Sequence, residues 1–141
     1  MHHELTGTEG WEKLKAVKDA VLVDVRTSRE WEVIGVPDLS ELDKEVLFVE
    51  WQMFPDMRVN PDFVTQLDQR LKAAGATEDS PILFLCRSGA RSKAAASAMA
   101  AAGYTNTINI SDGFEGDADE HGERAHINGW QFSGLPWEKQ S

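Results

Sequence analysis

Short apolar runs alternate with amphipathic stretches along most of this chain. The runs are rich in β-branched residues, which favour strands, and the stretches between them place apolar side chains on one helical face. The expected strands cover residues 21–26, 46–49, 81–85 and 107–110. Strands that alternate with helices form parallel crossovers, so the sequence predicts an α/β sheet covered by helices on both faces.

Residues that cap or stop helices indicate where the helices should begin and end. Thr8 is expected to cap a first helix and Ser28 a short second one. Asn60-Pro61 has the favoured order of cap and first-turn proline for a third helix. A fourth, alanine-rich helix is expected over residues 93–102, where Gly103 ends it. These helices fill the gaps between the expected strands.

Length and composition fit one domain. The 141 residues are expected to fold as a single domain, 1–141, with its core at about 8–137. A formal net charge of −10 argues against nucleic acid or an anionic membrane as a partner. No apolar run approaches the roughly 18 residues that cross a bilayer, and a single cysteine excludes an internal disulfide. We therefore expect a cytoplasmic location.

The only cysteine, Cys86, opens the sequence Cys86-Arg87-Ser88-Gly89-Ala90-Arg91-Ser92 between an expected strand and the alanine-rich helix. Free N–H groups and the helix dipole favour an anion at such a position. Arg87 and Arg91 stay cationic and favour the thiolate form of a cysteine. Cys86 is therefore a candidate nucleophile in a partly exposed site. The alternative is a buried structural cysteine, which two arginines in an apolar core disfavour.

Several ordered motifs resemble the single-domain rhodanese family, the rhodanese-like sulfurtransferases, over about residues 21–137. The matching motifs are Leu22-Val23-Asp24-Val25-Arg26 with Glu30-Trp31, Leu83-Phe84-Leu85 with the Cys86 loop, Ala102-Gly103-Tyr104, Gly129-Trp130 and Gly134-Leu135-Pro136. The Cys86 loop is the specific motif among them. The resemblance implies a central, mostly parallel twisted sheet of about five strands with helices on both faces.

The resemblance also implies chemistry at Cys86. In this family the cysteine accepts a sulfane sulfur from a donor, becomes a persulfide, and passes the outer sulfur to cyanide or to a thiol, protein thiols included. The binding loop would comprise Arg87, Ser88, Gly89, Ala90, Arg91 and Ser92. Its N–H groups would surround the persulfide, while Arg87 and Arg91 would orient a small anionic donor, for which thiosulfate is favoured. Neither a cofactor nor a metal is expected.

The same loop leaves alternatives open. Cysteine phosphatases and arsenate reductases carry an arginine six positions after the cysteine, where this chain has Ser92, and Arg91 lies one residue too early. The shorter loop favours a terminal sulfur over a phosphate. Another alternative is a persulfide relay without turnover or a regulatory binding module. Retention of Cys86 argues against a module that has lost its chemistry, and Ser92 is open between a donor to the persulfide and a helix cap.

Three charged residues near the first expected strand are interpreted as structural support. Asp24 and Arg26 end that strand, and Glu30 follows in the short helix. A buried strand end favours an aspartate that accepts from loop N–H groups and an arginine that pairs with an acid such as Glu30. We therefore expect the loss of Asp24 to lower stability before it alters chemistry.

Two segments depart from the compact family pattern. Trp51, Met53 and Phe54 are expected in the core, with an exposed partner site as the alternative. Residues 112–128 form an acidic, glycine-punctuated insertion, interpreted as a solvated loop that gates the pocket with the help of Phe114. Its spaced aspartates match a calcium loop only in part, because the bidentate glutamate is missing.

Overall fold

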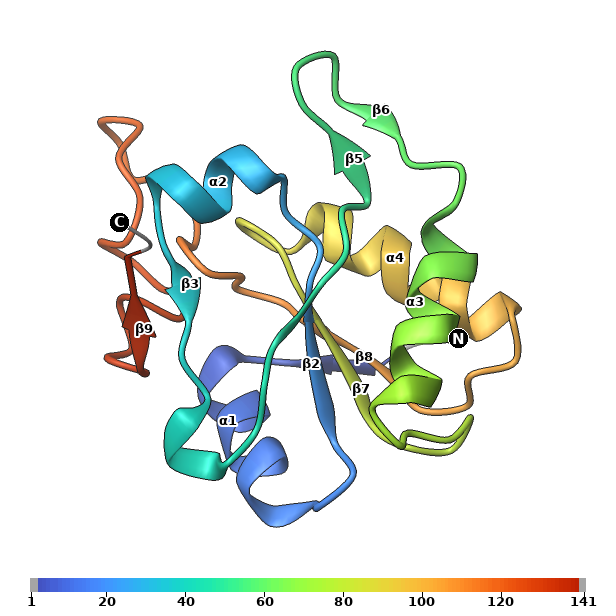
Figure 1. The fold of residues 1–141 in the computed structure, drawn as a ribbon. Helices are drawn as coiled ribbons and strands as arrows, with labels where there is room; N and C mark the ends of the chain where they lie inside the picture. Colours follow the sequence, from blue (N-terminus) through green and yellow to red (C-terminus); the bar gives the residue numbers. More distant parts are fainter. Residues whose placement is uncertain (1–2, 140–141) are drawn as a thin grey trace.

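The central sheet has five strands, all parallel, in the order β1–β8–β7–β2–β4 (Figure 1). The strands are β1 (His3–Leu5), β2 (Val21–Asp24), β4 (Leu47–Phe48), β7 (Ile82–Leu85) and β8 (Thr107–Ile110). The predicted α/β sheet is confirmed, and all four strands expected from apolar runs are present. β1 is additional to them, and it is short, with two of its three residues exposed.

The computed structural model describes residues 3–139. The outermost residues of the expected 1–141 domain, 1–2 and 140–141, therefore lie outside the described part. No helix within residues 3–139 is long and apolar enough to cross a membrane.

Helices cover both faces of the sheet, as expected (Figure 1). α1 (Gly7–Ala16) lies on one face, whereas α3 (Phe63–Ala73) and α4 (Ala90–Ala101) lie on the other. Successive strand side chains point to opposite faces, so each strand contributes to both layers of the core. Val23, Ile82 and Phe84 pack with α3 and α4, and Leu22, Leu83 and Ile108 pack with α1. The short α2 (Ser28–Val33) follows β2.

The first two helices start earlier than expected. α1 is capped by Thr6, not Thr8, and α2 is capped by Thr27, not Ser28. In both helices the threonine hydroxyl accepts from the N–H of a glutamate three residues later, and the glutamate carboxylate accepts from the threonine N–H. This reciprocal pair satisfies two otherwise free N–H groups, which favours the threonine over its neighbour.

The other two helix starts also differ from expectation. α3 begins at Phe63, because the Asn60 side chain accepts from the Asp62 N–H and holds the chain in a turn before the helix. α4 begins at Ala90, three residues before the expected start, because Gly89 takes the N-cap position.

Two small antiparallel pairs flank the main sheet. β5 (Gln52–Met53) pairs with β6 (Arg58–Val59), and β3 (Val36–Pro37) pairs with β9 (Trp137–Glu138). A 3₁₀ turn, η1 (Ser40–Leu42), lies between β3 and β4. Figure 1 shows the β5–β6 hairpin projecting beyond the same end of the sheet as α2.

The three apolar residues around β5 separate into different environments. Trp51 is half-buried and packs edge-on against the core residue Phe63, with 5.1 Å between ring centroids, so its expected place in the core is confirmed only in part. Met53 is half-buried. Phe54 is 52% exposed, and the expectation that it lies in the core is wrong because it sits in the hairpin turn.

Candidate active site

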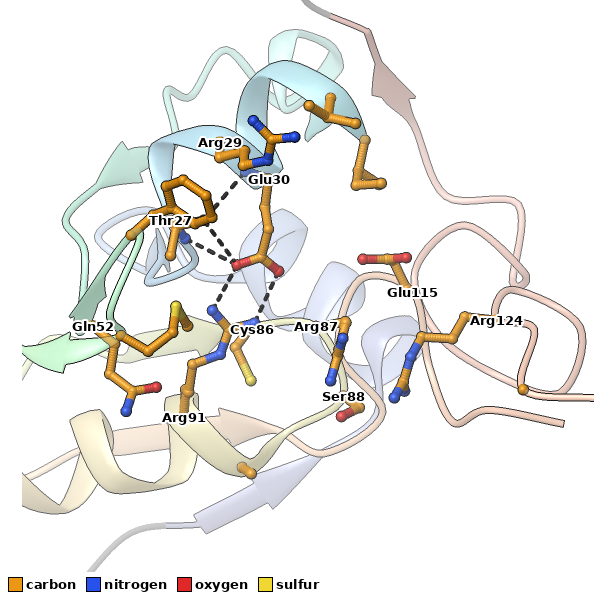
Figure 2. A pocket seen from close by; sticks show the side chains of 16 residues that line it. Thr27, Arg29, Glu30, Gln52, Cys86, Arg87, Ser88, Arg91, Glu115 and Arg124 are labelled. Atoms are coloured by element: carbon orange, nitrogen blue, oxygen red, sulfur yellow. Dashed lines mark hydrogen bonds and ion pairs between the residues drawn. The ribbon is translucent and has the colours of Figure 1, made fainter.

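Cys86 directly follows β7, in the loop that leads to α4 (Figure 2). The residue is 1% exposed, so the expected partial exposure is wrong, yet it lines a pocket of about 740 Å³. Its Sγ atom accepts a hydrogen bond from the Gly89 N–H at 3.1 Å and lies 3.2 Å from the Ser92 hydroxyl. Cys86 thus contacts the apolar core on one side and forms the polar floor of the pocket on the other.

Gly89 holds its N–H toward the sulfur through a backbone conformation that favours glycine. Its φ is +109°, in the left-handed region, and a Cβ at this position would collide with the carbonyl oxygen of Ser111. The residue is also the N-cap of α4. The tight turn of the loop and the direction of the donor therefore depend on the same residue.

Ser92 faces the sulfur from the first turn of α4. Its buried hydroxyl lies 3.2 Å from Sγ of Cys86, 3.2 Å from the Gly89 carbonyl oxygen and 2.5 Å from Oδ1 of Asn109. One hydroxyl proton serves one of these acceptors at a time, so the Gly89 N–H is the more constant donor to the sulfur. Of the two roles open for Ser92, the helix cap is wrong because Gly89 is the N-cap of α4, and the hydroxyl lies near both the sulfur and the closer Asn109 oxygen.

Asn109 on β8 supports the loop, and no sequence motif indicated it. Its Nδ2 donates to the Gly89 carbonyl oxygen at 3.1 Å, while its Oδ1 accepts from Ser92. The residue is buried. An amide side chain between the two isoleucines of β8 is the signal that would have marked it, because buried amides require partners.

Arg91 binds Glu30 of α2 through two parallel hydrogen bonds. The distances are 2.6 Å for Nη1–Oε1 and 2.9 Å for Nη2–Oε2. Burial acts to raise the pKa of Glu30, but the hydrogen bonds and charge of Arg91, together with the Thr27 N–H and the charge of Arg26, outweigh it and hold that pKa below its usual value. Burial opposes the charge on Arg91 as well, and Glu30 nevertheless raises the Arg91 pKa. Arg91 lines the pocket, but Glu30 occupies the guanidinium edge that was expected to receive an anion.

The expected pair between Arg26 and Glu30 is wrong for the described structure, because Arg26 binds Asp24 instead. Nη2–Oδ2 is 2.8 Å and Nε–Oδ1 is 3.0 Å, and both side chains are 0% exposed. Asp24 also accepts from the Arg26 backbone N–H at 3.1 Å. The guanidinium donates to the Gly35 carbonyl oxygen at 2.7 Å and stacks 4.2 Å from the Phe114 ring centroid. Arg26 therefore folds back onto its own strand end and leaves Glu30 to Arg91.

Residues 112–116 support the Cys86 loop through backbone hydrogen bonds. The Phe114 N–H donates to the Cys86 carbonyl oxygen at 2.8 Å, and the N–H groups of Glu115 and Gly116 each donate to the Arg87 carbonyl oxygen at 3.0 Å. Phe114 is fully buried, so the expectation that it helps to gate the pocket is wrong. The start of this insertion is part of the framework of the site.

The acidic residues further along the insertion satisfy local turns. Asp119 accepts from the N–H groups of His121 and Glu123, and it pairs with His126 at 2.9 Å. The ligand-type atoms of Asp119, Glu123 and His126 lie within 4.8 Å of one another, the one such group found in the described part of the chain. These contacts account for the cluster as a loop-forming arrangement.

Charged and apolar side chains both line the pocket above Cys86. Figure 2 shows Glu30 and Arg91 meeting near Cys86, with Arg87, Glu115 and Arg124 on the other side of the sulfur. Ser88 and Ala90 complete the loop wall, and apolar side chains line the rest of the mouth: Val33, Ile34, Phe54 and Met57. Among the residues that the structure describes, every predicted loop residue lines the pocket except Gly89 and Ser92, which are buried.

Sequence reasoning missed three charged residues of the pocket: Arg29, Glu115 and Arg124. Arg29 lies beside Phe54, with its guanidinium 5.1 Å from the ring centroid, and Arg124 donates to the Gly116 carbonyl oxygen at 2.6 Å. Glu115 and Arg124 come from the insertion, where charged residues otherwise suggest only a solvated loop. Tertiary packing alone brings them to Cys86.

Comparisons with known proteins give a family and a fold. The model of the family described as the STR4 middle domain matches residues 4–141. An uncharacterized protein of Rickettsia conorii, RC0915, is 37% identical over 134 residues, which are 95% of each chain. The crystal structure of Rv0390 from M. tuberculosis is 43% identical, covers 98% of each chain and has a TM-score of 0.88.

More distant structures identify the fold as rhodanese-like. A rhodanese-like domain protein from Staphylococcus aureus is 17% identical, covers 99% of each chain and has a TM-score of 0.57. The polysulfide-sulfur transferase homodimer from Wolinella succinogenes is 20% identical with a TM-score of 0.60, over 99% of this chain and 80% of that one. At this level of identity the likeness concerns the fold.

Proposed function

This chain belongs to the STR4 middle domain family, and we propose that it is a thiosulfate sulfurtransferase-like enzyme, a single-domain rhodanese. The enzyme moves a sulfane sulfur from a donor such as thiosulfate to a thiol or cyanide through a persulfide on Cys86. The rhodanese-like fold supports this proposal, because a polysulfide-sulfur transferase shares it. A single thiol is kept reduced most easily in the cytoplasm, which is the location we propose.

The observation that carries the proposal is the position of the Cys86 sulfur. Sγ lies on the floor of an open pocket, at the amino end of α4, and receives the Gly89 N–H at 3.1 Å. A helix amino end and a directed N–H both stabilise negative charge on sulfur. These groups stabilise the Cys86 thiolate when it attacks the donor, and they stabilise it again when the acceptor takes the outer sulfur and the thiolate is released.

The reaction consists of two displacements. In the first, the Cys86 thiolate attacks the outer sulfur of thiosulfate, a new S–S bond forms, and sulfite leaves with the electron pair of the broken bond. In the second, the acceptor attacks the outer sulfur of the persulfide, and the electron pair returns to Sγ of Cys86. The sum is group transfer, so neither step needs an external oxidant.

Arg87 and Arg124 are the arginines best placed to attract the donor. Arg87 is exposed at the pocket, and Arg124 lines it from the insertion. Arg91 is tied to Glu30 at 2.6 Å and 2.9 Å and therefore positions the loop more than it receives substrate. Guanidinium groups near a buried sulfur attract an anion despite the chain's overall charge of −10, because salt screens distant charges.

A persulfide relay to a protein thiol is the second candidate. It is favoured by the apolar side chains at the pocket mouth, where Val33 is 54% exposed, Phe54 52% and Met57 36%. Exposed apolar groups of this size tend to mark contact surfaces. A relay uses the same persulfide but requires a protein acceptor for release.

Turnover with thiosulfate and cyanide tests the proposal. We expect thiocyanate formation by the wild type with double-displacement kinetics, and none by Cys86→Ser. Hydrolysis of an aryl phosphate is measured in parallel. Phosphatase activity without thiocyanate formation would contradict the transferase, whereas persulfide formation without turnover on cyanide would favour the relay.

A further inference from the structure

Glu115 is the carboxylate of the pocket that has no fixed partner. Among the described residues that line the pocket, the acidic side chains are Glu30 and Glu115, and no histidine, lysine or tyrosine is present. Glu30 binds Arg91 with both oxygens and also accepts from Thr27. Within residues 3–139, no hydrogen bond or ion pair is found for the Glu115 carboxylate. One of the two acids is therefore occupied, and the other is available.

The backbone of Glu115 is fixed next to the nucleophile. Its N–H donates at 3.0 Å to the carbonyl oxygen of Arg87, the residue that follows Cys86. The side chain is half-buried and points into the pocket that Cys86 also lines (Figure 2). The hydrogen bond thus holds the backbone of Glu115 beside the Cys86 loop, while the carboxylate stays free to move within the pocket.

We propose that Glu115 is the general base that removes the proton from the acceptor thiol in the second displacement. This inference rests on the proposed function. Only the thiolate attacks sulfur, whereas a thiol of ordinary acidity, with a pKa of about 8.5, is mostly protonated at neutral pH. A base in the pocket that Cys86 also lines would supply the thiolate where it is used.

The step balances in atoms and charge. The S–H proton of the acceptor moves to a Glu115 oxygen, and the acceptor sulfur forms a bond to the outer sulfur of the Cys86 persulfide. The bond between the two persulfide sulfurs breaks, its electron pair stays on Sγ, and the acceptor leaves as its own persulfide. Glu115 then returns the proton to solvent through the open pocket.

The electrostatic surroundings of Glu115 suit this role. The charged groups that face it are Arg26 at the end of β2, Glu30 on α2, Arg87 in the Cys86 loop and Arg124 in its own segment. Burial and, to a smaller extent, Glu30 raise its pKa, and the three arginines oppose them without cancelling the effect. A carboxylate with a raised pKa is a better base near neutral pH.

The test compares two acceptors with protein that has first been loaded with sulfur from thiosulfate. One acceptor is an alkyl thiol that is mostly protonated at the assay pH, and the other is an aromatic thiol that is already ionised. Glu115→Gln is expected to lower kcat/KM for the alkyl thiol by about 100-fold and to have a much smaller effect with the aromatic thiolate. The control is Glu120→Gln, which removes the same charge from a side chain that is 87% exposed in the same insertion.

The pH profile provides a second readout. With the alkyl thiol, wild-type kcat/KM is expected to fall as the pH drops through the raised pKa of Glu115, because the protonated acid is no longer a base. Glu115→Gln should lack this limb and follow the ionisation of the thiol alone. Equal losses with both acceptors, or an unchanged profile, would overturn the inference. Failure of wild-type protein to load sulfur would instead contradict the proposed function.

Discussion

At the scale of single residues, Gly89 links backbone conformation to sulfur chemistry. Its positive φ directs the N–H to Sγ of Cys86, and the Ser111 carbonyl oxygen lies where a Cβ of this residue would be. A side chain at this position would have to displace the backbone of the next strand end. Glycine is therefore required at position 89 for two reasons: no side chain fits there, and its N–H must point at the Cys86 sulfur.

Gly89→Ala is expected to weaken both stability and sulfur loading. The collision with Ser111 and the unfavourable φ should cost about 1–3 kcal/mol in the free energy of unfolding, measured by denaturant titration. Gly75→Ala is the control, since Gly75 has a φ of +85° but nothing within 4 Å of the added Cβ. The control should lose only about 1 kcal/mol, from the left-handed conformation alone, and should load sulfur normally. Equal behaviour of the two variants would contradict the role assigned to Gly89.

Asp24 is expected to matter for stability through its buried pair. Asp24→Ala leaves the Arg26 guanidinium buried with its main partner removed, and this should cost about 3–5 kcal/mol. The melting temperature and the denaturant midpoint both report this loss. Unchanged stability combined with lost turnover would instead assign Asp24 to the chemistry.

At the scale of elements, Glu30 joins α2 to the Cys86 loop. Its carboxylate completes the capping pair with Thr27 and accepts two hydrogen bonds from Arg91 at the start of α4. The short helix α2 has no fully buried residue of its own. Its position over the pocket therefore depends on this acid together with the edge-on packing of Trp31 against Phe48.

Glu30→Gln is expected to cost about 1–3 kcal/mol in the free energy of unfolding at about pH 7. The folded state lowers the Glu30 pKa, so the stabilisation is present above the unfolded carboxyl pKa and is lost as the pH falls through the folded one. The difference between wild type and variant should therefore shrink in acid. Glu32→Gln, at an exposed position of the same helix, is the control. A difference that stays constant with pH would contradict the ionised pair.

The element starts show what local sequence can and cannot indicate. Thr6 and Thr27 could have been recognised as caps, because each has a glutamate three residues later. The strand β1 could not have been predicted, because its three residues have no apolar pattern and form a strand only by pairing with β8. The remaining sheet strands were predictable, since burial on both faces gives them mostly apolar sequences.

At the scale of the whole molecule, the site is assembled from distant parts of the chain. The Cys86 loop was predictable because a nucleophile, its glycine and its arginines are contiguous in sequence. The sequence did not indicate the roles of Asn109, Glu115 and Arg124. These residues reach the pocket region only when β8 and the insertion pack against the loop. The partner of Arg91 was also missed, since two acids near Arg26 compete for two arginines and only the fold decides the pairing.

The central claim is that Cys86 carries the transferred sulfur. Intact-mass measurement after incubation with thiosulfate and removal of excess donor tests it most directly. The account predicts a gain of one sulfur atom per chain, located on Cys86 by peptide mapping, removed by cyanide and absent from Cys86→Ser. An unmodified mass under conditions where thiosulfate loads a known sulfurtransferase, or an adduct that persists in Cys86→Ser, would contradict it.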